Sequence, residues 1–130
     1  MERAMGPING HSLDHQIEDA LGFHGVVTQK LRLAARDRRM RSVRPAILTD
    51  YFGKFGHWLW SLQQDERIAR SPHFRGVMTA YAGYRKAAVR AARLVEDGCP
   101  DRAEALLNAG CYHQASDILV SEMQAWRRNI

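Results

Sequence analysis

Apolar residues recur at helical spacing along three long stretches of the chain. In the first stretch the steps between apolar positions alternate between four and three, which is typical of a helix that buries one narrow face. These positions are Leu13, Ile17, Ala20, His24, Val27, Leu31 and Ala34. Ser12 precedes them and has a side chain suited to an N-cap, so we predict a helix that begins at Ser12 and ends near Arg38.

The second stretch carries clear start and stop signals. Ser71 and Pro72 match the N-cap and the first helical position, and Gly98 can adopt the left-handed conformation that ends a helix. The apolar positions between them are Phe74, Val77, Tyr81, Tyr84, Ala88, Ala91 and Val95. The third stretch opens at Pro100 and Asp101, and we predict one last helix whose apolar stripe includes residues from Ala103 to Trp126 and is interrupted by Gly110.

Residues 50–60 concentrate aromatic residues and glycines, reading Asp-Tyr-Phe-Gly-Lys-Phe-Gly-His-Trp-Leu-Trp. Aromatic side chains bury large areas, and glycines allow the backbone to turn or approach closely. We therefore predict a compact corner formed by a short helix from Phe52 to Leu62. We expect a loop through Pro45 before this corner and a polar linker from Gln63 to Arg70 after it.

These elements predict an all-α fold, because no segment shows the sustained alternation of apolar and polar residues that is typical of strands. Three long helices and the aromatic corner helix, joined by brief connections, predict an antiparallel up-and-down four-helix bundle. We expect residues 12–130 to form this single domain and residues 1–11 to be a flexible lead-in.

Composition narrows the class of protein further. No apolar run reaches the length of a membrane span, and the N-terminal residues lack the apolar core of a signal peptide, so we expect a cytoplasmic protein. The two cysteines, Cys99 and Cys111, are too few for a disulfide framework and are expected to be free thiols.

Positive charge is concentrated in residues 30–44, which contain seven basic residues and one acid, Asp37. The basic residues considered as a binding patch are Arg36, Arg38, Arg39, Arg41 and Arg44. Such a patch can bind nucleic acid or an acidic partner. It can equally be the solvated end of a helix, where cations are favoured by the helix dipole. No aromatic residues lie among these arginines, so a surface for stacking single-stranded nucleic acid is not indicated.

Among the residues that could carry chemistry, His24 is the most distinctive because its neighbours on the stripe are apolar. A histidine there is either a hydrogen-bonded core residue or a ligand. His11 and His15 have the spacing of half a metal site, but their place at the start of a helix favours exposed polar residues. No nucleophile–base–acid set and no glycine-rich phosphate loop occur in the sequence, so we do not expect an enzyme.

From about residue 13 to 127 the chain resembles the chemoreceptor zinc-binding domain, a bacterial four-helix sensor domain. The matching residues are His24 and Leu31 in the first helix, Asp50, Phe55, Gly56, Trp58 and Leu59 in the corner, and Gly110, Tyr112 and Ser116 in the last helix. The resemblance implies that zinc would be held by one histidine, the corner cysteine and two further histidines. The corresponding positions here are His24, Gly53, Tyr81 and Arg85.

Only one of these four ligands is kept, and a structural zinc site needs about four donors. We therefore expect no family zinc site and no other cofactor. A metal site relocated to His24, His57 and water is an alternative. In place of zinc we hypothesise that Tyr81 bonds to His24, and that Arg85 finds an acceptor, binds an anion or extends to solvent. The candidate pocket for a small anionic or polar ligand is lined by His24, His57, Trp58, Tyr81 and Arg85.

The resemblance implies a sensory or regulatory role in bacterial signalling such as chemotaxis. Because the chain has no room for a separate output domain, we expect a stand-alone bundle that acts by ligand binding, dimerisation or docking on a protein partner. One alternative is a basic adaptor that binds nucleic acid or acidic proteins through residues 30–44, with nucleic acid the weaker case. The other is a metal-binding protein with a relocated ligand set.

Overall fold

A computed structural model of the chain describes residues 10–36 and 44–130. Within these ranges every regular element is a helix. The helices are α1 (Gly10–Arg36), α2 (Arg44–Gln63), α3 (Glu66–Ala69), α4 (Pro72–Glu96), α5 (Pro100–Asn108) and α6 (Cys111–Arg128). None of the helices in this part of the chain is both long enough and apolar enough to cross a membrane.

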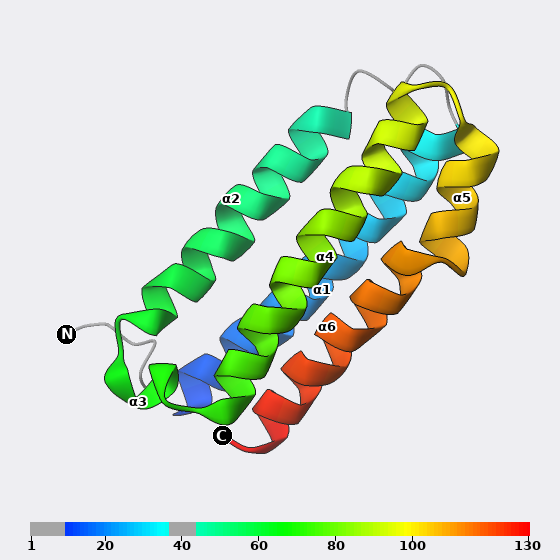
Figure 1. The fold of residues 1–130 in the computed structure, drawn as a ribbon. Coiled ribbons are helices and arrows are strands. Elements are labelled where there is room, and N and C mark those ends of the chain that lie inside the picture. The colour runs from blue at the N-terminus through cyan, green and yellow to red at the C-terminus, as the bar shows by residue number, and fades with distance from the viewer. Residues whose placement is uncertain (1–9, 37–43) are drawn as a thin grey trace.

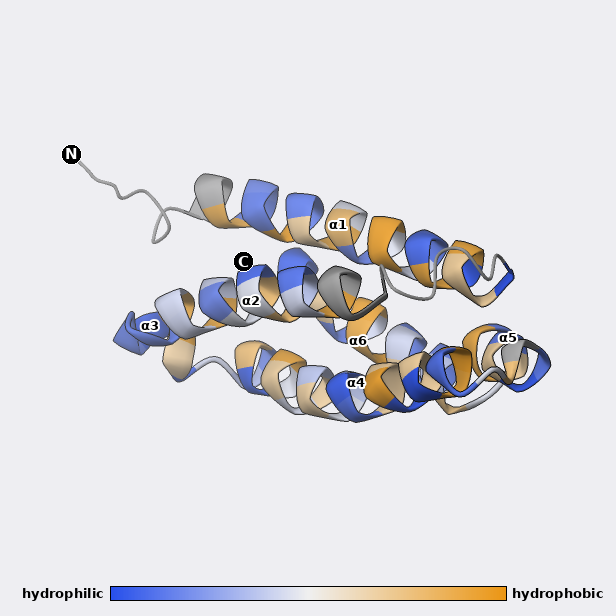
Figure 2. Ribbon diagram, turned by 90° about the horizontal axis from the view of Figure 1, so that it is seen from above, coloured by the Kyte–Doolittle hydropathy of each residue, from blue (hydrophilic) through white to orange (hydrophobic). Residues whose placement is uncertain are grey.

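The long helices run up and down as four antiparallel arms, with α5 and α6 together forming the fourth arm (Figure 1). Around the bundle, α1 packs against α2, α2 against α4 and α4 against α6. Helix α6 also packs against α1, which closes the bundle. The predicted all-α antiparallel bundle is therefore confirmed. Figure 2 shows the apolar side of α1 turned toward the other helices, as its four-three spacing predicts.

The helix predicted between Ser71 and Gly98 is confirmed together with both of its end signals. The hydroxyl of Ser71 accepts a hydrogen bond from the backbone N–H of Phe74 at 3.4 Å, and Pro72 occupies the first turn. At the other end Gly98 has a φ of 78°, in the left-handed region. The N–H of Gly98 bonds to the carbonyl of Val95 and that of Cys99 to the carbonyl of Leu94, which together form a Schellman motif.

The aromatic segment is not a short corner, because it forms the C-terminal part of the 20-residue helix α2. Pro45, expected in a loop, is the second residue of this helix, where its missing N–H costs nothing. The buried residues of α2 are Leu48, Tyr51, Phe55, Leu59 and Leu62, which continue one helical stripe through the segment. The expected polar linker contains the single turn α3, which buries Ile68.

Helix α1 begins at Gly10, so Ser12 lies inside the helix and is not its N-cap. The expected end near Arg38 lies outside the described residues. The core positions of the predicted stripe are otherwise confirmed. The stripe residues that are buried are Leu13, Ile17, His24, Val27, Leu31 and Ala34.

The expected last helix is divided at Gly110, which stands as the N-cap of α6 after α5 has ended at Asn108. A Cβ added at Gly110 would lie 2.8 Å from the Cα of Leu106, closer than such atoms approach. The division therefore depends on a backbone contact that only glycine permits, and the four-residue spacing of the stripe does not show it.

Replacing Gly110 with alanine is expected to destabilise the bundle by about 2 kcal/mol, because the added methyl group overpacks against backbone atoms. Urea denaturation monitored by circular dichroism measures the change. The matched control is Gly22→Ala, where the new methyl group meets no atom within 4 Å. That substitution is expected to stabilise α1 by about 0.5 to 1 kcal/mol. Equal effects of the two substitutions would contradict the packing argument.

Candidate functional site

His24 lies in the middle of α1 and is only 3% exposed. Its Nδ1 atom is hydrogen-bonded to the hydroxyl of Tyr51 on α2 at 2.8 Å, and its Nε2 atom to the hydroxyl of Ser116 on α6 at 2.7 Å. The histidine thus joins three arms of the bundle. Since both ring nitrogens are engaged by protein groups, a metal could bind His24 only by displacing Tyr51 or Ser116.

A second run of hydrogen bonds ends on the backbone of His24. The hydroxyl of Thr28 donates to the His24 carbonyl at 3.2 Å, so it must accept from the hydroxyl of Tyr112, which lies 2.9 Å away. Tyr112 in turn accepts from the hydroxyl of Tyr84 at 2.8 Å. Because each hydroxyl has one hydrogen, the direction of the whole chain is fixed as Tyr84 to Tyr112 to Thr28 to His24.

Together with Tyr81, the residues Tyr51, Tyr84 and Tyr112 account for all four tyrosines of the chain, and every one is buried. Burial raises the pKa of each of these phenols, and burial lowers the pKa of His24 from 6.5 to about 4. At neutral pH the cluster is therefore uncharged, because low-polarity surroundings disfavour the ionised form of each group. This arrangement suits a hydrogen-bonded core better than a centre for proton transfer at pH 7.

The expected hydrogen bond between Tyr81 and His24 is wrong. The hydroxyl of Tyr81 instead donates to the carbonyl of Phe52 at 3.4 Å, and its ring stacks on Phe55 with 4.9 Å between ring centres. Tyr84, one turn further along α4, packs its ring against the imidazole of His24 at 4.8 Å. The register of α4 against α1 thus brings Tyr84, and not Tyr81, to the histidine.

The other residues of the candidate pocket lie in separate places. Arg85 is exposed, with its guanidinium 5.0 Å from the ring centre of Phe52. His57 is also exposed and stacks on Trp60. The structure therefore brings Tyr81 and Arg85 together beside Phe52, while His24 lies in the core and His57 on the surface.

Gly53, which the resemblance aligns with a zinc-binding cysteine, is exposed, and a Cβ added there would meet nothing within 4 Å. The described residues contain no group of three or more His, Cys, Asp or Glu side chains placed to hold a metal ion. In the basic run, Arg36 forms an ion pair with Glu104 at 3.3 Å, and Arg44 begins α2. Arg38, Arg39 and Arg41 lie outside the described residues.

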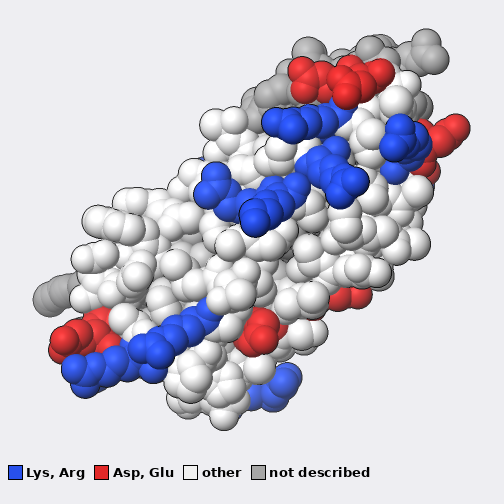
Figure 3. All heavy atoms as spheres, viewed as in Figure 1, with Lys and Arg blue, Asp and Glu red and all other residues white. Residues whose placement is uncertain are grey.

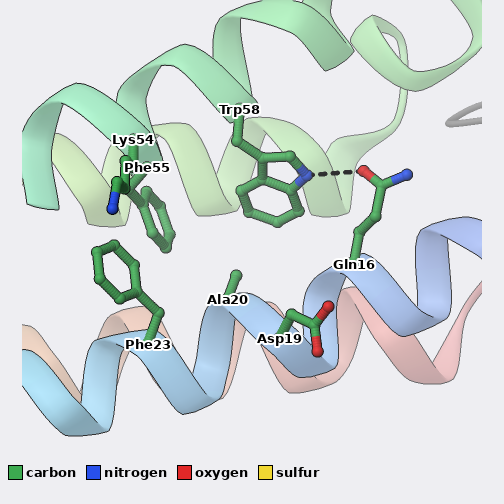
Figure 4. A pocket seen from close by; sticks show the side chains of 7 residues that line it. All are labelled: Gln16, Asp19, Ala20, Phe23, Lys54, Phe55 and Trp58. Atoms are coloured by element: carbon green, nitrogen blue, oxygen red, sulfur yellow. Dashed lines mark hydrogen bonds between the residues drawn. The ribbon is translucent and has the colours of Figure 1, made fainter.

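A pocket of about 290 Å³ opens between α1 and α2. Figure 4 shows its lining side chains, which are Gln16, Asp19, Ala20, Phe23, Lys54, Phe55 and Trp58. Aromatic faces from both helices form its walls, and Ala20 leaves space between them. Trp58 is fixed by the hydrogen bond from its Nε1 to the side-chain oxygen of Gln16 at 2.8 Å.

Two charged side chains stand at this pocket. Lys54 places its Nζ 5.8 Å from the ring centre of Phe23 and 3.3 Å from Asp50. Asp19 lies on α1 near Gln16 and contacts His15 at 3.6 Å. Both are exposed, so they can turn toward a ligand without breaking the core. The pocket is thus apolar inside, with one cationic and one anionic group at its edge.

Of these lining residues, only Trp58 was expected to belong to a ligand pocket. The available signal was the pairing of the small residue Ala20 on the first stripe with the aromatic residues of the corner. The fold defines an all-α bundle with a neutral His–Tyr core and an aromatic pocket between two of its arms. Comparisons with family models, curated proteins and solved structures found no match to this chain.

Proposed function

We propose that this chain is a regulatory helical bundle that senses a small aromatic molecule in the pocket between α1 and α2. The observation that carries the proposal is the pocket itself, whose walls are aromatic and whose edge offers Asp19 and Lys54. Pockets of about 300 Å³ with apolar walls and a few polar groups are typical of sites for small molecules. This pocket takes the place of the ligand pocket that was expected around His24 and Arg85.

The walls of the pocket are continuous with the core, which gives a physical route from ligand to fold. Phe55 stacks on Tyr81 of α4 and packs at 5.2 Å from the ring of Tyr51. Trp58 packs against Trp126 of α6 at 5.9 Å between ring centres. A ligand that moved either wall would therefore bias the packing of α4 and α6, and shifts of packed helices are a common form of switching.

The pocket is tested with benzyl alcohol, benzylamine and phenylacetate, which share a ring and differ in charge. We expect at least one of them to shift the indole N–H resonance of Trp58 in a two-dimensional NMR titration, with saturation at millimolar concentration or below. Preference for the amine would identify Asp19 as the orienting group, and preference for the acid would identify Lys54.

Ala20→Leu is the variant that tests this location, since it fills the space between the walls. We expect Ala20→Leu to abolish the shift of the Trp58 resonance on adding the probes. Ala82→Leu makes the same change on the exposed side of α4 and is expected to leave that shift intact. The proposal fails if no probe shifts Trp58, or if the shifts are the same in Ala20→Leu as in the unchanged protein.

We further propose that the bundle works without zinc and without catalysis, in the cytoplasm. This part rests on the substitutions at Gly53, Tyr81 and Arg85 relative to the family pattern, and on the two free cysteines. Metal analysis of protein purified without a His tag is expected to find less than about 0.1 metal ion per chain, because a four-coordinate site needs four donors. A stoichiometric amount of bound metal would overturn the proposal that the bundle works without zinc, and would favour a relocated set of metal ligands.

A further inference from the structure

A long groove lies between α4 and α6, apart from the pocket between α1 and α2. Two hollows of about 500 and 330 Å³ form it, and they share Gly83, Ala115 and Ile118. The lining residues on α4 extend from Arg75 to Arg90, which corresponds to roughly 22 Å of helix. The groove is therefore about as long as four turns of a docked helix.

The floor of this groove is apolar and open. A Cβ added at Gly83 would meet nothing within 4 Å, so α6 does not fill the space beside it. Ile118 on α6 borders the floor and is 56% exposed. An exposed isoleucine beside an open apolar channel provides a contact for an apolar side chain from outside.

The α4 side of the groove is basic. Arg75, Lys86 and Arg90 line it, and α4 as a whole has five basic residues and one acid, Glu96. Figure 3 shows Lys and Arg side chains gathered over the α4 side of this face. Among the described acidic side chains none forms an ion pair with Lys86 or Arg90. The groove thus offers cations to a partner, and Glu122 of α6 is the one acidic residue among the described residues that line it.

We propose that this groove binds an acidic amphipathic helix of a partner protein. The apolar residues of such a helix would lie along the floor beside Gly83 and Ile118, and its carboxylates would face Lys86 and Arg90. A second copy of this chain fits less well, because it would present the same basic α4 face and be repelled. Nucleic acid also fits less well, since the described residues that line the groove include no aromatic side chain for stacking.

The test is selection from a displayed library of 18-residue helical peptides, using the full chain as bait. The peptides carry Leu or Ile at i, i+3, i+4 and i+7 positions and random Glu, Lys or Ala on both flanks. We expect the enriched peptides to have several-fold more Glu than Lys on the flanks. We expect Lys86→Glu with Arg90→Glu to weaken their binding at least tenfold.

Gly83→Leu, which fills the floor, is also expected to weaken binding at least tenfold. The matched control Arg85→Glu changes charge on the side of α4 that faces Phe52 and is expected to weaken binding less than twofold. Circular dichroism and thermal unfolding confirm that each variant is folded. Three results would overturn the proposal: no enrichment, enrichment of Lys over Glu, or peptide binding unchanged by Gly83→Leu. Dimerisation of the chain that Gly83→Leu abolishes would also overturn it, by assigning the groove to a second copy.

Discussion

Lowering the pH from 7 to 4 is expected to remove about 3 kcal/mol of folding stability through His24 alone. Burial lowers the pKa of this imidazole from 6.5 to about 4 in the folded chain. Between about pH 6.5 and pH 4, His24 is protonated in most unfolded molecules but stays neutral in most folded ones. The contribution of His24 is therefore present at pH 7, is lost mainly between pH 6.5 and 4, and levels off below pH 4.

Desolvation, and not a lost hydrogen bond, is the physical cause of this effect. A protonated imidazole donates from both ring nitrogens, and the hydroxyls of Tyr51 and Ser116 can both accept. The partners of His24 thus tolerate the charged form. What opposes protonation is the transfer of a cation out of water into a site that is 3% exposed, where none of the described carboxylates is bonded to the imidazole ring.

Urea denaturation at several pH values between 7 and 4 measures this effect in the unchanged protein and in His24→Gln. Glutamine keeps a donor and an acceptor for Tyr51 and Ser116 but does not titrate. Between pH 7 and 4 the unfolding free energy of His24→Gln should therefore fall by about 3 kcal/mol less than that of the unchanged protein. Carboxylates titrate in both proteins and cancel in the difference. The control His57→Gln removes an exposed histidine and should retain the full pH dependence. Parallel pH profiles for His24→Gln and the unchanged protein would refute the assignment.

The parts of the fold that could be predicted from the sequence are those whose signals are local. Helix α4 has its N-cap, its proline and its terminal glycine within a few residues of each boundary, and all three act on the backbone of the same segment. Helix α2 lacked such signals, and Pro45 suggested a loop. The apolar stripe from Leu48 to Leu62 nevertheless has the spacing of one long helix, and a proline in the first turn of a helix does not interrupt it.

The buried position of His24 followed from the apolar stripe on α1, but its partners did not. Tyr51, Tyr81 and Tyr84 all lie on helices that face α1, and a rotation or shift of one turn exchanges one tyrosine for another. That choice depends on the relative register of whole helices, which arises from the packing of every core residue. The pocket between α1 and α2 could not be predicted for a related reason. It exists because a small side chain, Ala20, leaves space opposite α2, and the helix register decides which residues lie opposite one another.

Replacing Trp126 with alanine is expected to destabilise the bundle by about 3 to 5 kcal/mol, the range for removing a large buried aromatic side chain. Trp126 is 3% exposed and joins three arms at one end of the core. From α6 it packs on Trp58 of α2 at 5.9 Å and on Phe74 of α4 at 5.5 Å between ring centres. The neighbouring helices can close such a cavity only by giving up other contacts, so most of the loss should persist.

The matched control is Trp60→Ala, which makes the same change on α2 at a side chain that is 58% exposed. Urea denaturation should place its effect within about 0.5 kcal/mol of zero.

The two variants also test how the pocket is supported, since Trp58 packs on Trp126 and forms a wall of the pocket. We expect Trp126→Ala, but not Trp60→Ala, to shift the indole N–H resonance of Trp58 and to weaken its response to the aromatic probes. If both variants lose the same stability, or if Trp58 is unmoved by Trp126→Ala, then α6 does not hold the pocket wall and the proposed route from ligand to fold fails.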